Sequence, residues 1–173
     1  GEENWTNKLI IGENKLILSS LIKGKLNKDI QSVGGVKMIY IDPPFNAGLD
    51  FSMDIPIGTN NADHKRRRVE SLAYSDKWFD GERSFLSMIY ERLILAHSIL
   101  NKDGLIFVHC DYRSNAYIRL LMDEVFGKSC FINQIIWRRK GGAALREMSN
   151  LSNAHDIILC YSKQKGCKLN PIF

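Results

Sequence analysis

Long apolar runs and paired cysteines are both missing from this 173-residue chain. No apolar stretch approaches the ~20 residues that a membrane-spanning helix needs, so we expect no membrane partner. The first residues also lack the basic-then-apolar layout of a secretory signal. The four cysteines are scattered, without a C-x2-C pair, which argues against a metal site and against a disulfide framework. We therefore expect reduced thiols in a cytoplasmic protein.

The composition is that of an ordinary soluble domain, with 45% hydrophobic and 25% charged residues. We expect residues 1–173 to form a single domain with a proper core. The net charge of +5 is modest, but basic residues gather in two runs: Lys65, Arg66, Arg67 and Arg68, and then Arg138, Arg139 and Lys140. Such runs suit contacts with the phosphates of DNA, and the alternative is a solvated surface.

Proline is scarce, yet two of the four prolines stand together directly after an apolar run, in Asp42-Pro43-Pro44-Phe45. The run at 36–41 is typical of a buried strand. Prolines supply no backbone N–H and favour extended conformations before them, which makes the rim of this strand rigid. Asp42 and the Pro43 carbonyl can accept hydrogen bonds from an exocyclic amino group, and Phe45 can stack on an aromatic base. The alternative is a plain strand-terminal turn.

Strands and helices alternate along the sequence. We expect strands at 8–12, 36–41, 105–110, 132–139 and 155–162, and helices after Asn14, over 83–101 and from Ser114 to Gly127. The last two strands are too close in sequence to need a crossover helix, so we expect them to be antiparallel. Residues 46 to about 80 show no sustained periodicity, which suggests a long functional or mobile loop.

This alternation predicts a three-layer α/β fold with a mostly parallel sheet. Ligands bind such folds beyond the carboxyl ends of the strands, where both Asp42 and Asp111 lie. Asp111 precedes Ser114, so we expect it to cap the following helix. For His155 and Asp156, at the start of a strand, we favour a structural role over catalysis.

The chain resembles the amino-methylating DNA methyltransferases, and within them the adenine-N6 enzymes of the permuted (beta) class, especially modification subunits of type III restriction systems. Asp42-Pro43-Pro44-Phe45 matches the catalytic tetrapeptide of this family. The resemblance spans nearly the whole chain and includes residues 74–78, 85–93, 104–108, 135–140 and 155–163. It implies the Rossmann-like fold of class I methyltransferases, with the antiparallel strand pair near the C-terminus.

The resemblance also implies a function. The protein would transfer a methyl group from S-adenosylmethionine to the N6 amine of an adenine flipped out of duplex DNA. Asp42 and Pro43 would hold the amine, and Phe45 and Trp137 would stack on the two faces of the base. N4-cytosine methylation and a non-catalytic DNA-binding module remain alternatives. The expected partners are DNA, a restriction subunit and a second copy of the chain.

One part of the family pattern is missing from this sequence. Family members bind the cofactor through a glycine-rich turn after a strand, and neither Gly34-Gly35 nor Gly141-Gly142 has that setting. Glu13 stands where the family commonly has Asp; with Asp42 it would face the cofactor, or it is a plain exposed acid.

We therefore expect residues 1–173 to be the N-terminal catalytic half of a longer enzyme, inactive alone, with the cofactor turn and the target-recognition region C-terminal to it. Without the cofactor strands, the strand at 36–41 would be a sheet edge. Such an edge recruits another chain unless the segment at 8–12 covers it.

Overall fold

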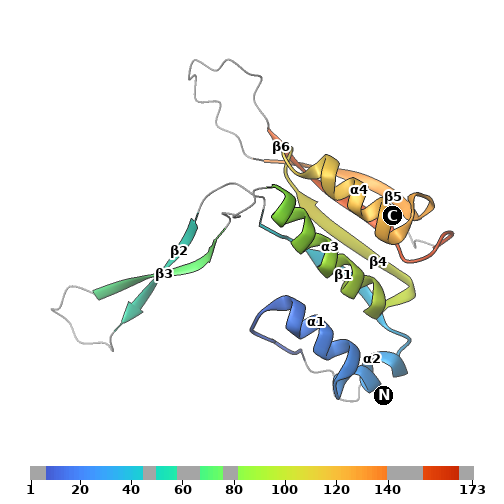
Figure 1. Cartoon of the computed structure of the whole chain (residues 1–173), viewed down its shortest axis with the longest axis horizontal. Coiled ribbons are helices and arrows are strands. Elements are labelled where there is room, and N and C mark those ends of the chain that lie inside the picture. Colours follow the sequence, from blue (N-terminus) through green and yellow to red (C-terminus); the bar gives the residue numbers. More distant parts are fainter. Residues whose placement is uncertain (1–6, 45–49, 58–66, 76–81, 140–153, 168–173) are drawn as a thin grey trace.

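The computed structural model describes residues 7–44, 50–57, 67–75, 82–139 and 154–167 (Figure 1). Their elements are α1 (Asn14–Lys23), α2 (Leu26–Ser32), β1 (Val36–Ile41), β2 (Asp50–Ile57), β3 (Arg67–Ser75), α3 (Glu82–Ile99), β4 (Leu100–Cys110), α4 (Asn115–Phe126), a 3-10 turn (Lys128–Cys130), β5 (Phe131–Arg138) and β6 (His155–Ser162). None of the helices in these ranges is long and apolar enough to cross a membrane.

Four strands form the main sheet, in the order β1-β4-β6-β5. β1 runs parallel to β4, and α3 lies between them in sequence, as expected for a parallel crossover. β6 runs antiparallel to both β4 and β5, which confirms the predicted antiparallel C-terminal pair. The α/β class is as predicted, but the described sheet is mixed, and its one parallel pairing is β1 with β4.

The core lies between this sheet and the helices α3 and α4, which pack side by side on one of its faces (Figure 1). In α3, Phe85, Ile89 and Leu93 recur at the spacing of one helical face and are at most 3% exposed. Apolar residues of α4, β4 and β6 complete the cluster. On the opposite face Met38 and Tyr40 are more than half exposed, and no described helix covers it. The described residues thus supply two of the three predicted layers.

Two segments differ from the prediction. Residues 8–12 form no strand, and Leu9 and Ile11 are 88% and 87% exposed. β1 is therefore an edge strand of the described sheet, and this segment does not cover it. Residues 46–80 are not without regular structure either, because β2 and β3 pair as an antiparallel hairpin in a separate sheet.

The capping of the helices is close to the prediction. Glu13, one residue before the expected Asn14, caps α1. Ser114 stands at the N-cap of α4, but the capping acceptor is Asp111, whose Oδ1 lies 3.0 Å from the Arg113 N–H nitrogen and 3.3 Å from that of Ser114. The capping role predicted for Asp111 is confirmed, and Gly127, at φ 89°, ends the helix as expected.

Candidate active site

Asp42 is the first residue after β1, at the carboxyl end of the strand. Its side chain is 61% exposed, whereas Pro43 behind it is buried and Pro44 is half-buried. The two prolines therefore anchor the rim, and the carboxylate extends into the open. Phe45 lies outside the described residues.

His109 of β4 lies beside Asp42. Its Nδ1 is 3.1 Å from Asp42 Oδ1, and the imidazole is only 16% exposed. The parallel register explains the contact, because Ile41 pairs with Val108 and the next residue of each strand then lies on the same face. Side chains alternate along a strand, so with Ile106 and Val108 buried in the core, His109 points to the face opposite the helices.

Asp156 continues this row of polar side chains on β6. Its Oδ2 is 3.6 Å from His109 Nε2, and its Oδ1 is 3.5 Å from Nε of Arg139. The Asp156 side chain is 7% exposed, whereas that of Arg139 is 44% exposed. Asp42, His109, Asp156 and Arg139 thus form a row of alternating acidic and basic side chains across the end of the sheet, which we call the carboxylate–histidine row.

Cys110, the residue after His109, is unsuited to act as a nucleophile. Burial raises the pKa of the Cys110 thiol to about 12, and the negative charges of Asp111 and Asp156 contribute. A thiol with so high a pKa is protonated at neutral pH and is a poor nucleophile. Tyr40 lies two residues before Asp42, on the same face of the sheet. Burial, with a contribution from the charge of Asp42, raises the pKa of its hydroxyl. Among the described residues, no group of His, Cys, Asp or Glu side chains could hold a metal ion.

Trp137 is not brought to Asp42. It lies on β5, three strands away from β1, and strand spacings of about 4.8 Å make that roughly 14 Å. Trp137 pairs with Asp156 and is 58% exposed, so it shares a face with the carboxylate–histidine row. The sandwich with Phe45 remains a prediction that would have to span this distance.

The basic runs are only partly within the described ranges. Arg67 and Arg68 open β3, and Arg138 is exposed at the end of β5. Arg139 pairs with Asp156 and offsets the charge of this buried carboxylate, a contact that the sequence did not indicate. Lys65, Arg66 and Lys140 lie outside the described residues.

Glu13 is engaged in the packing of α1. Its Oε2 accepts a hydrogen bond from the backbone N–H of Leu16 at 3.0 Å, and its Oε1 pairs with the guanidinium of Arg92 in α3. Desolvation acts to raise the pKa of Glu13, but backbone N–H groups and Arg92 together lower it. The carboxylate therefore caps α1 and links α1 to α3.

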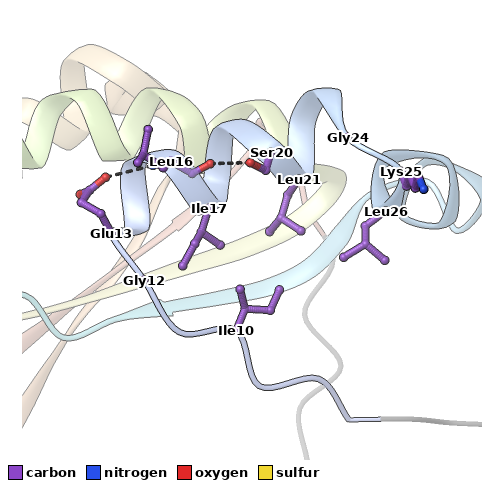
Figure 2. Close-up of a pocket in the computed structure, with 10 residues that line it drawn as sticks. All are labelled: Ile10, Gly12, Glu13, Leu16, Ile17, Ser20, Leu21, Gly24, Lys25 and Leu26. Atoms are coloured by element: carbon purple, nitrogen blue, oxygen red, sulfur yellow. Dashed lines mark hydrogen bonds between the residues drawn. The ribbon is translucent and has the colours of Figure 1, made fainter.

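An apolar hollow of about 410 Å³ lies beneath α1 (Figure 2). Ile17, Leu21 and Leu26 point toward Ile10 across it, and Glu13 stands at one end with its carboxylate turned to the backbone of Leu16. Such a lining offers little to the charged and polar groups of S-adenosylmethionine. The hollow itself is therefore a poor match for the cofactor, and the predicted contacts of Glu13 and Asp42 with the cofactor remain predictions.

His109 is the site residue that the sequence did not reveal. The sequence shows only a polar residue within an apolar strand, two residues before Asp111. Its connection to Asp42 depends on the register of β1 and β4, which the sequence alone does not specify.

The described sheet, with its parallel β1–β4 pair, is part of the fold of class I methyltransferases, as solved structures show. TTHA0409 of Thermus thermophilus shares this fold with a TM-score of 0.55 at 12% identity, over 92% of this chain and 54% of that one. The cytosine-N4-specific PvuII DNA methyltransferase does so with a TM-score of 0.54 at 11% identity, over 90% and 48%.

The sequence identifies the family. The DNA methylase family signature matches residues 36–170, and the chain therefore belongs to this family of N6 and N4 methyltransferases. It is 35% identical over 160 residues to the type II methyltransferase M.EcaI of Enterobacter cloacae, which is 92% of this chain and 30% of that protein. It is 29% identical to the EcoP15I Mod subunit of Escherichia coli, a type III restriction-modification enzyme, over 95% of this chain and 26% of that subunit. The chain thus spans under a third of either relative.

Proposed function

We propose that the protein containing this chain methylates the N6 amine of adenine in duplex DNA, as the modification part of a restriction-modification system. The observation that carries the proposal is Asp42, an exposed carboxylate on a rigid diproline rim at the carboxyl end of β1. The similarity to a type III Mod subunit supports the biological setting.

In this proposal the chain binds and orients the acceptor amine. Asp42 and the Pro43 carbonyl accept hydrogen bonds from the two amine hydrogens, which directs the nitrogen lone pair and offsets the positive charge that develops on nitrogen. Phe45 stacks on the flipped base. S-adenosylmethionine supplies the methyl group, and we propose that Asp42 and Glu13 face it.

The basic residues extend the proposal to the DNA backbone. The run at 65–68, at the start of β3, and Arg138 and Lys140 near the end of β5 would contact phosphates, which add affinity without sequence choice. Arg139 contributes less, because it already pairs with Asp156. A restriction subunit and a second copy of the protein are the further partners we propose.

N4-cytosine methylation is the second candidate, since the cytosine amine fits the same rim and the PvuII enzyme shares the fold. Asp42 favours adenine, because N4 enzymes of this family more often carry Ser at that position. The third candidate is a DNA-binding module without catalysis.

Nucleoside mass spectrometry of DNA treated with the full-length protein and S-adenosylmethionine separates these functions. We expect N6-methyladenine. N4-methylcytosine would replace the adenine assignment with the second candidate, and bound but unmodified DNA would support the module.

A further inference from the structure

We propose that His109 is a positioning residue for Asp42, and that Asp156 holds His109 in place; this inference rests on the proposed function. The two carboxylates lie at opposite nitrogens of one imidazole, at 3.1 Å from Nδ1 and 3.6 Å from Nε2. His109 thus fixes the direction of the carboxylate that receives the amine.

Asp42 needs such support because little else holds its side chain. The carboxylate is 61% exposed, and the outer torsion of an aspartate has a broad minimum. The contact from His109 Nδ1 reaches Oδ1 and leaves Oδ2 for the amine of the base. A reacting group that is displaced by ~1 Å can lose 10²-fold in rate.

Burial makes the support rigid. The imidazole is 16% exposed and the Asp156 carboxylate 7% exposed, whereas the Asp42 carboxylate faces solvent. Arg139 lies 3.5 Å from the second oxygen of Asp156 and offsets its charge. The row therefore runs from the solvent-facing Asp42 to the buried Asp156. The buried Asp156 holds His109, and His109 in turn supports the exposed Asp42 carboxylate.

The geometry assigns a different job to each ring nitrogen, and two substitutions separate them. The amide nitrogen of asparagine occupies nearly the place of Nδ1, so His109→Asn keeps a donor toward Asp42. The amide of glutamine reaches the place of Nε2, so His109→Gln keeps the contact with Asp156 and loses that with Asp42. Only His109→Asn gives up the contact with Asp156, and Arg139 remains beside Asp156 in both variants. A faster Asn variant could therefore not be explained by an unpaired buried acid.

The experiment measures single-turnover methylation, DNA affinity and thermal unfolding for the full-length wild type, His109→Ala, His109→Asn and His109→Gln. His155→Asn is the matched control, because the same change falls on the neighbour of Asp156 whose side chain alternates to the other face of β6. We expect His109→Ala and His109→Gln to slow methylation about 10- to 100-fold. His109→Asn should be less impaired than either, because it keeps the donor toward Asp42 and loses only the support of Asp156, and DNA affinity should be unchanged in all variants.

Equal rates for the Asn and Gln variants, or an Ala variant within threefold of wild type, would overturn the positioning role. A second readout does not depend on methylation: the ring nitrogen resonances of His109 in an NMR spectrum, with and without Asp42→Ala. A shift of the Nδ1 signal supports the contact even if the wild type proves inactive on DNA, which would count against the proposed function alone. An unchanged signal would remove the contact on which the inference stands.

Discussion

Replacing Asp42 by alanine in the full-length protein tests the proposed chemistry most directly. The substitution removes one acceptor for the amine of the base and one contact with His109, and nothing from the core, because the side chain is 61% exposed. Removing one preorganised partner of a reacting group typically costs 10²–10³ in rate, or about 2.7–4 kcal/mol in barrier height. Stability should change by at most about 1 kcal/mol, because most of the Asp42 side chain is in solvent and the substitution leaves no cavity.

The assay is single-turnover transfer of a labelled methyl group to DNA, combined with DNA affinity by fluorescence anisotropy and urea unfolding. Asp29→Ala is the charge-matched control, because Asp29 is exposed on α2 and has no part in the proposed site. We expect a loss of at least 10²-fold for Asp42→Ala, none for Asp29→Ala, and unchanged DNA affinity for both. A methylation rate within threefold of wild type would refute the role of Asp42, and a parallel loss of DNA affinity would show that it acts in binding.

Four further outcomes are expected. Alanine at all of positions 65–68 should weaken DNA binding regardless of sequence and flatten the plot of log affinity against log salt by up to ~0.9 per lost contact; an unchanged slope would make the run a solvated surface. Burial raises the pKa of the Cys110 thiol to about 12, so it stays protonated at pH 8, and a disulfide reagent should label the partly exposed Cys167 first and Cys110 only on unfolding. Rapid Cys110 labelling in the native protein would contradict the burial. Tyr161→Phe should cost about 1.5–3 kcal/mol in urea unfolding, because the hydroxyl donates to Asp123 Oδ1 at 2.6 Å in a buried setting, and a loss below 0.5 kcal/mol, roughly the scatter of surface substitutions, would contradict this. The 173-residue chain should self-associate through β1 in light scattering, and Met38→Lys should reduce this association; a monomer at all concentrations would count against the open edge.

Much of the secondary structure could be predicted from local sequence patterns. The strands at 36–41 and 155–162 were predicted at their observed bounds, because each is an apolar run between residues that break regular structure. The buried face of α3 follows from the spacing of Phe85, Ile89 and Leu93. These features depend on neighbours in sequence, so one sequence suffices to predict them.

Features that depend on distant partners were missed. Residues 8–12 have the composition of a strand, but a strand also needs a neighbour to pair with, and the structure gives them none. The hairpin of β2 and β3 was missed although Phe51, Met53, Ile55 and Ile57 alternate along the sequence, because Pro56 interrupts the pattern.

The site likewise contains one residue that local sequence predicts and several contacts that depend on distant segments. Asp42 was predictable, because the tetrapeptide is local and rigid. The contacts of Asp42 with His109 and of His109 with Asp156 arise from pairing between segments that are far apart in sequence. The engagement of Glu13 with Arg92 likewise required the packing of α1 against α3.

The interior position of β6 has a consequence for how the protein is made. β6 is the last described strand in the chain, yet it lies between β4 and β5. During synthesis, β1 and β4 can pair and bring His109 to Asp42 before β6 has left the ribosome, whereas Asp156 arrives only with β6. The carboxylate–histidine row is therefore completed only with β6, and a chain without β6 carries Asp42 and His109 without Asp156.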